Sequence, residues 1–240
     1  MPGSAFRRLD PDRVIGTVAR LRDRIRERFP AASLGDLADE LVLAAREHRA
    51  RTEQIRRANM PLRWLCAALV IAAATALAWA IESVHPRLGD AWPWPEVLQS
   101  LESSLGALFF LGAGGVFVMT LESRGRRRRC LDALHELRAM AHIVDMHQLT
   151  KDPERIGDPS RNTPSSPERD LDAFALARYL DYCSELLSLI GKLAALYVQG
   201  FPDATAVAAV DDIEDLTNGL SRKIWQKIAF LDAREAPSAR

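Results

Sequence analysis

The chain has 240 residues, of which 48% are hydrophobic and 27% are charged, with 32 basic and 32 acidic side chains. This length suits one or two compact domains, and the neutral total argues against a general nucleic-acid-binding protein. The three cysteines, Cys66, Cys130 and Cys183, are far apart and odd in number, which argues against a disulfide framework or a zinc knuckle. Abundant Ala, Leu and Arg favour a helical protein.

Two amphipathic helices are predicted within residues 1–60, which we assign to an N-terminal cytoplasmic helical pair. The first covers residues 11–29, and Pro30 ends it. The second begins at Ser33 and runs toward Pro61. The predicted core stripe of the first helix, spaced by three or four residues, is Val14, Val18, Leu21, Ile25 and Phe29. That of the second is Leu34, Leu37, Leu41, Ala45 and Ile55.

Two charge-free stretches predict a transmembrane helical hairpin over residues 61–122. Eighteen such residues lie at 64–81 and nineteen at 103–121. At about 1.5 Å per residue, these helices are about 27–29 Å long, close to the hydrocarbon thickness of a bilayer of about 30 Å. The other interpretation is that both stretches are core helices of a soluble protein. The arginines that flank both stretches disfavour it.

The distribution of arginines predicts the orientation of the two spans. Many arginines precede the first span and follow the second, whereas Arg87 is the single basic residue between them. The positive-inside rule therefore predicts that both termini are cytoplasmic and that residues 83–101 form an outer loop. We expect Trp92 and Trp94 at the membrane interface, and Pro93 and Pro95 to keep this loop out of a helix. The predicted location is the inner membrane of a bacterium-like cell.

Small residues within the spans predict close contacts between membrane helices. The first span repeats alanine every fourth residue, and the second has a glycine cluster at mid-span. The cluster could equally be a flexible kink or part of a pore lining. Neither span contains an ionisable residue, which argues against a pump or a proton-coupled transporter. The candidate packing or pore-lining residues are Ala68, Ala72, Ala76, Ala80, Gly112, Gly114 and Gly115.

An arginine run follows the second span and opens a predicted juxtamembrane helix over residues 123–151. The run suffices as a topology anchor, and it could also bind anionic lipid headgroups. Contact with nucleic acid is disfavoured, because no aromatic residues alternate with the arginines. The arginines are Arg124, Arg126, Arg127, Arg128 and Arg129.

The rest of the chain predicts a Pro-rich, flexible linker over residues 152–168 and a C-terminal cytoplasmic helical hairpin over 169–234. Its helices are predicted at 171–199 and 205–232. Glu185 and Lys192 divide the first into pieces too short to cross a membrane, so we interpret it as a buried core helix. Cys183 has no plausible base beside it and is expected to be a small core residue.

Basic side chains surround Trp225 in the last of these helices. Either this segment lies on the membrane surface, or Ile224 and Ile228 are core residues and the bases are solvated. The bases in question are Arg222, Lys223 and Lys227.

Three of the five histidines occur in "HELRAMAHIVDMHQ", residues 135–148. On a helix, His135, Arg138, His142 and Asp145 lie on one flank, whereas His147 points about 120–140° away. One hypothesis is a metal site of His135, His142 and Asp145, completed by Asp181 or Glu185 on another helix. Imidazoles seven residues apart are about 10 Å from each other along the axis, too far for one ion. We therefore favour a polar seam, a possible sensor, whose side chains satisfy one another, beside a packing stripe.

The packing stripe predicted for this segment is Leu134, Leu137, Ala141, Val144 and Gln148.

The sequence as a whole predicts an all-α protein, with a two-span transmembrane hairpin and a cytoplasmic bundle formed by the N- and C-terminal segments. We expect a self-associating, non-enzymatic inner-membrane protein with an interaction or sensing module, without cofactor or metal. Its predicted partners are the lipid bilayer, further copies of itself and a cytoplasmic protein. One alternative is an oligomeric channel or membrane-permeabilising effector lined by Gly112–Gly115; a second is a metal-dependent cytoplasmic enzyme.

Overall fold

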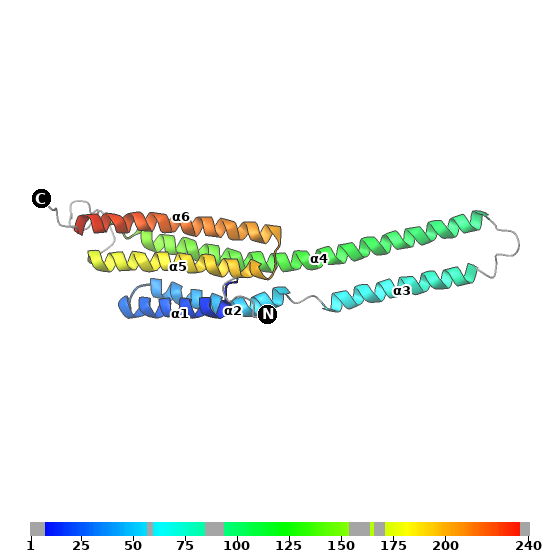
Figure 1. The fold of residues 1–240 in the computed structure, drawn as a ribbon, viewed down its shortest axis with the longest axis horizontal. Coiled ribbons are helices and arrows are strands. Elements are labelled where there is room, and N and C mark those ends of the chain that lie inside the picture. Colours follow the sequence, from blue (N-terminus) through cyan, green and yellow to red (C-terminus); the bar gives the residue numbers. More distant parts are fainter. Residues whose placement is uncertain (1–7, 57–59, 85–93, 154–163, 166–170, 236–240) are drawn as a thin grey trace. The chain divides into compact units, whose positions relative to one another are not determined.

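The fold was analysed in a computed structural model, which describes residues 8–56, 60–84, 94–153, 164–165 and 171–235. These residues form six helices and no strand, which confirms the all-α prediction for this part of the chain (Figure 1). The helices are α1 (Pro11–Arg28), α2 (Leu34–Arg56), α3 (Met60–Val84), α4 (Trp94–Leu149), α5 (Ala173–Gln199) and α6 (Ala204–Glu235).

The chain divides into two compact units, which are described separately. The first, here called the bundle, comprises Met1–Arg56 and Arg129–Arg240. The second, here called the apolar unit, comprises Arg57–Arg128. α4 is a single helix that contributes residues to both units.

Short acidic side chains begin three of the helices. The Asp10 carboxylate accepts hydrogen bonds from the backbone N–H groups of Asp12 and Arg13 at the start of α1. Asp172 caps α5 in the same way, and the Asp203 carboxylate accepts from the first turn of α6. These carboxylates satisfy N–H groups that have no partner within the helix, which fixes where each helix begins.

α1 and α2 pack against each other, as the short turn between them predicts. Arginines of α1 reach carboxylates of α2: Arg26 contacts both Asp36 and Asp39, and Arg22 donates to Asp39 at 2.9 Å. A side chain at Gly35 would meet the Arg26 side chain at 2.9 Å. Glycine at this position therefore allows Arg26 to lie across the start of α2.

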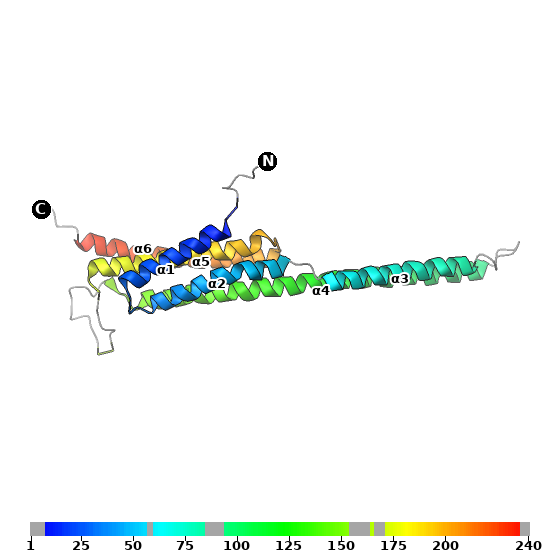
Figure 2. The same ribbon diagram turned by 90° about the horizontal axis from the view of Figure 1, so that it is seen from below.

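α5 is the central helix of the bundle. It packs against α1, α2 and α6, and Figures 1 and 2 show these helices running alongside one another. Its side chains are buried on most sides, which confirms the interpretation of residues 171–199 as a core helix. The two charged residues that argued against a span lie at its surface, where Glu185 pairs with Arg24 and Lys192 donates to Ser188.

α4 is longer than the sequence predicted. It begins at Trp94, so the expectation of a non-helical outer loop up to residue 101 is wrong for residues 94–101. Pro95 stands in the first turn, where the missing N–H costs nothing because that group has no helical partner. The same holds for Pro61, in the first turn of α3. Continuation of the helix beyond the arginine run to the end of the juxtamembrane segment is confirmed.

Two other expectations concern segments that the structure does not describe. Residues 85–93 contain the predicted tip of the outer loop, with Trp92 and Pro93, and residues 154–163 and 166–170 contain most of the predicted linker. The hairpin arrangement of the two spans, the outer loop and the flexibility of the linker therefore stay predictions.

Replacement of a central core residue tests the role of α5. Leu187 is fully buried, so Leu187→Ala removes apolar contacts and leaves a cavity, and we expect the free energy of unfolding to fall by about 2–5 kcal/mol. Urea denaturation of the full chain in detergent, followed by circular dichroism, measures the change. The control is Leu43→Ala, at a leucine that is 51% exposed, with an expected change within about 0.5 kcal/mol. Equal effects of the two substitutions would contradict the assignment.

Candidate functional site

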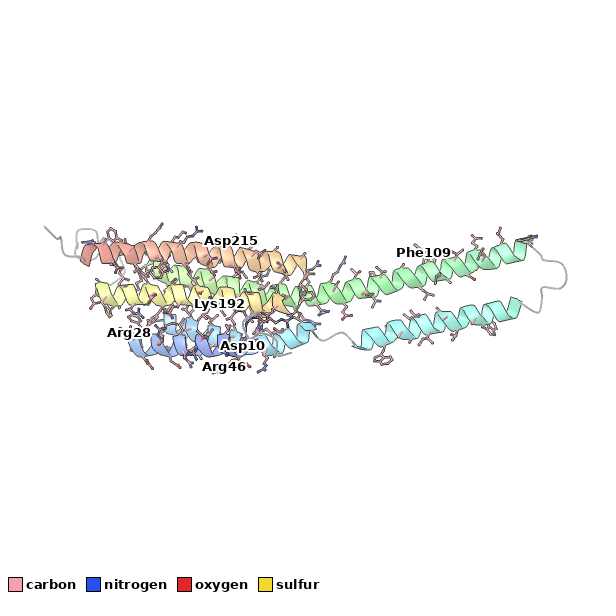
Figure 3. All side chains as sticks on the ribbon, viewed as in Figure 1. Asp10, Arg28, Arg46, Phe109, Lys192 and Asp215 are labelled. Atoms are coloured by element: carbon pink, nitrogen blue, oxygen red, sulfur yellow. The ribbon has the colours of Figure 1, made fainter. Side chains whose placement is uncertain are left out.

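The apolar half of α4 has an exposed surface. Among the described residues, α4 is the one helix long and apolar enough to cross a membrane, and its most apolar window has no buried residue. Phe109 is 72% exposed and extends away from the helix in Figure 3. A contiguous apolar surface of this extent is typical of a site that contacts lipid or protein. The other large exposed apolar side chains between residues 103 and 121 are Leu105, Leu108, Phe110, Val116, Phe117, Met119 and Leu121.

α3 also exposes apolar side chains, including Trp64 at 70% and Trp79 at 72%. Both threonine hydroxyl groups in these stretches are satisfied within their own helices: Thr75 donates to the Ile71 carbonyl at 3.0 Å and Thr120 to the Val116 carbonyl at 2.8 Å. Such bonds leave few polar groups in need of water, which suits a helix surrounded by hydrocarbon.

The small residues of the two apolar stretches make no close contact within the described part of the chain. Apart from neighbouring residues and the nearby backbone of α4 itself, no described atom lies within 4 Å of a Cβ built at Gly112, Gly114 or Gly115. Ala68 and Ala72 are exposed, whereas the side chains of Ala76 and Ala80 lie outside the described residues. The role of these residues in packing between membrane helices therefore stays a prediction.

An open groove of about 400 Å³ runs along α4 in the apolar unit. Arg124 lies at one end of it, is exposed, and makes no ion pair with a described residue. Beyond Arg124, Arg128 and Arg129 are exposed, and Arg126 and Arg127 are half-buried. The other described residues that line the groove are Ala113, Val116, Phe117, Thr120 and Leu121.

The predicted polar seam of the juxtamembrane segment does not form as expected. His135, Arg138 and His142 are exposed, and no hydrogen bond joins them to one another or to Asp145. Asp145 instead accepts a hydrogen bond of 2.6 Å from the buried Gln148 amide. Water can satisfy the hydrogen bonds of exposed side chains. These groups therefore gain little from pairing with one another, although they share one flank of the helix.

The packing stripe beside that flank is confirmed. Its five members are all buried in the core of the bundle, each with no more than 3% of its surface exposed. Gln148 is the polar member, and its Oε1 atom has no hydrogen-bond partner in the described structure. The stripe, rather than the histidine flank, is thus the part of this segment that contacts the rest of the bundle.

The residues of the metal hypothesis are not brought together. Among the described residues, no group of three His, Cys, Asp or Glu side chains is placed to hold one ion. The two carboxylates that would have completed the site are engaged elsewhere, because Asp181 pairs with Arg178 at 2.7 Å and Glu185 with Arg24 at 2.8 Å.

His48 of α2 is a buried polar group that the sequence analysis missed. It is 2% exposed, its ring meets the Tyr197 ring edge-on at 4.4 Å between centroids, and it hydrogen-bonds to the Thr52 hydroxyl at 3.2 Å. Burial lowers the pKa of His48 to about 4, so the ring is neutral near neutral pH. The spacing between Ala45 and Ile55 on the predicted stripe already places position 48 on the buried face.

An ion pair lies next to this histidine and connects α2 with α4. The Arg51 guanidinium contacts Glu136 of α4 and Glu47 of its own helix. Arg51 also lies close to Tyr197, and burial raises the pKa of Tyr197 to about 12. His48, Arg51, Glu136 and Tyr197 thus form a polar contact among α2, α4 and α5, here called the His48 cluster.

Lys227 of α6 fastens the end of α4. Its ammonium group donates to the backbone carbonyls of Gln148 at 2.8 Å and Lys151 at 3.2 Å, and the Gln148 carbonyl also accepts from the Lys151 N–H at 3.1 Å. Burial lowers the pKa of Lys227. The expectation that this lysine is solvated is therefore wrong, whereas the burial of Ile224 and Ile228 confirms them as core residues.

The cysteines of the bundle are unsuited to nucleophilic chemistry. Cys130 and Cys183 are both fully buried, and burial raises their pKa values to about 11 and about 12. A protonated, inaccessible thiol is a weak nucleophile, which agrees with the interpretation of Cys183 as a small core residue.

Fold and surface together define a helical bundle joined in sequence to a helix long and apolar enough to span a membrane. Comparisons of the chain with protein-family models, with curated proteins and with solved structures give no match.

The depressed pKa of His48 predicts how stability changes with pH. Between pH about 6.5 and about 4 the unfolded chain binds a proton that the folded bundle excludes, so the free energy of unfolding falls as the pH falls through this window. His48→Phe keeps an aromatic ring but cannot titrate. We expect the loss of stability between pH 7 and pH 4.5 to be smaller in this variant by about 1–3 kcal/mol.

Urea denaturation at the two pH values measures this difference. His142→Gln is the control, because the His142 side chain is exposed and contacts none of the cluster. An unchanged pH dependence in His48→Phe would show that this ring is not the buried titrating group.

Removal of the Lys227 ammonium tests its contact with the end of α4. Lys227→Met keeps most of the aliphatic stem but leaves two carbonyls without this donor, and we expect a loss of about 1–3 kcal/mol in the free energy of unfolding. Amide hydrogen exchange should accelerate in the last turn of α4. Lys223→Met, at an exposed lysine of the same helix, should change neither measurement appreciably; an equal effect would contradict the capping role.

Proposed function

We propose that this protein is a multi-pass integral membrane protein whose bundle is a cytoplasmic interaction or sensing module. In this proposal it acts by self-association and partner binding, without catalysing a reaction. The location is the inner membrane of a bacterium-like cell, with both termini in the cytoplasm.

The observation that carries the proposal is the division of α4 into two kinds of surface. Residues 103–121 have no charge and expose their large apolar side chains, whereas the segment from Cys130 to Gln148 contributes one buried stripe to the bundle. One helix therefore supplies both a surface suited to hydrocarbon and part of the core of a water-soluble module.

The proposed orientation rests on the arginines. Five of them lie within residues 124–129, at the end of the apolar stretch that adjoins the bundle segment in sequence. Basic residues beside a span are retained on the cytoplasmic side, which supports a cytoplasmic bundle.

Self-association is supported by the unfilled small-residue surfaces. In a membrane, helices associate where small residues allow their backbones to approach, and Gly112 and Gly115 lie on neighbouring positions of α4. A protein partner for the bundle is supported by apolar side chains exposed at the end of α4, where Met146 is 66% and Leu149 62% exposed.

Membrane insertion is tested by extraction of cell membranes with alkaline carbonate. We expect the full chain to stay in the membrane pellet and to require detergent for release. A fluorescent protein fused to the C-terminus, of a type that matures only in the cytoplasm, should be bright. Recovery of the protein in the carbonate supernatant, or a dark fusion on an inserted chain, would contradict insertion or orientation respectively.

A pair of glycine substitutions tests self-association. Gly115→Leu should reduce the yield of cross-linked dimers in native membranes about tenfold, because the leucine side chain keeps the two backbones apart. Gly106→Leu is the matched control, since nine residues at about 100° per residue place it on the opposite side of α4. If both variants cross-link as wild type does, association does not use this glycine face.

A channel or membrane-permeabilising effector is a second candidate, favoured by the open glycine cluster. A ring of chains could turn this face toward a pore, and the narrow side chains would leave room for water. Purified protein in planar bilayers should then conduct, with a conductance altered by Gly114→Leu. Electrically silent bilayers at several voltages and protein densities would exclude this candidate.

A further inference from the structure

The groove on α4 is apolar along most of its length and positively charged at one end. Five uncharged residues among those the structure describes line it from Ala113 to Leu121, and Arg124 lies at its end. Ala113 and Arg124 are eleven residues apart, which places them within about 20° on the helix surface and about 16 Å apart along the axis. This length is close to half the hydrocarbon thickness of a bilayer of about 30 Å.

The two polar side chains of the groove differ in whether they already have a partner. The Thr120 hydroxyl already donates to the Val116 carbonyl of its own helix. Arg124, in contrast, is exposed and has no carboxylate partner among the described residues. The groove therefore presents an apolar wall and one positive charge in need of an anion at its end.

We propose that this groove binds one anionic phospholipid, with the phosphate on Arg124 and an acyl chain along the wall formed by Val116, Phe117 and Leu121. The inference rests on the proposed membrane location of the protein. The proposed function requires only that the protein lies in a bilayer; this inference adds one specific lipid as a ligand.

Charge complementarity favours a lipid over a second copy of the chain. A second copy in the same orientation would bring the five arginines of its residues 124–129 to the level of Arg124. Only one carboxylate, Glu122, would come with them, so like charges would outnumber opposite charges there. The apolar stretch between residues 103 and 121 contains no acidic residue that could pair with Arg124. An anionic lipid offers both a negative headgroup and an apolar chain in the required order.

Gly115 lies on the side of α4 that is opposite the groove. Gly115 follows Ala113 by two residues, so the two positions lie about 160° apart around the helix. A lipid in the groove thus leaves Gly115 available for self-association, so substitutions at Gly115 and at Ala113 can be tested separately.

Native mass spectrometry of the full chain in detergent tests the proposal by titration with dioleoyl phosphatidylglycerol. We expect one tightly bound lipid per chain, with dioleoyl phosphatidylcholine bound at least tenfold more weakly. Glycerol phosphate, which has the anion without the chains, should show no saturable binding. Equal affinity for the two lipids, or saturable binding of glycerol phosphate, would overturn the proposal.

Two matched pairs of variants locate the lipid. Arg124→Gln should weaken phosphatidylglycerol binding about fivefold, whereas Arg126→Gln, about 160° away on the helix, should weaken it less than twofold. Ala113→Phe fills the groove and should abolish the tight site, whereas Ala107→Phe on another face should not. Equal losses for Arg124→Gln and Arg126→Gln would indicate general attraction to the arginine run and would overturn a specific site.

The remaining outcomes separate this inference from the proposed function. A chain that inserts into membranes but binds phosphatidylglycerol equally well with and without Ala113→Phe refutes the lipid site alone. Recovery in the carbonate supernatant refutes the membrane location and the lipid site with it. A loss of cross-linked dimers in Ala113→Phe, with lipid binding unchanged, identifies a second copy as the occupant of the groove and overturns the proposal.

Discussion

The bundle depends on the burial of α5. This helix is apolar on most of its circumference, so it is stable in water only when several other helices cover it. α1 and α2 from the N-terminal part of the chain and α6 from the C-terminal part supply that cover. Because the covering helices lie on both sides of the apolar unit in sequence, folding of the bundle requires the two distant parts of the chain to meet.

α4 contributes to that requirement and to the proposed contact with the membrane. Its buried residues near the C-terminal end follow one face of the helix, as in a helix that packs against a core, whereas residues 103–121 are uncharged all round. The backbone hydrogen bonds of a helix are satisfied internally in either environment, so one continuous helix can serve both. Lys227 and the His48 cluster fasten the bundle segment of α4 to its neighbours.

The polar contacts of the bundle join neighbouring helices to one another. Arg26 with Asp39, Arg51 with Glu136 and Lys227 with the end of α4 each join two helices through a charged group. Charged contacts of this kind require specific geometry, whereas apolar contacts tolerate sliding. A module whose helices are fixed in this way is suited to present a defined surface to a partner, which is the role proposed for it.

The sequence by itself determined the presence of the helices, the core stripes and the apolar stretches, though not where α4 begins, because periodicity and charge-free length are local properties of the chain. It did not determine which polar residues meet. The histidine flank of α4 looked self-satisfying as a pattern, but its side chains face solvent, while His48 is buried against Tyr197, 149 residues further along. The groove that ends at Arg124 is likewise visible only in three dimensions. Contacts between helices depend on how the helices pack, and tertiary structure alone decides that packing.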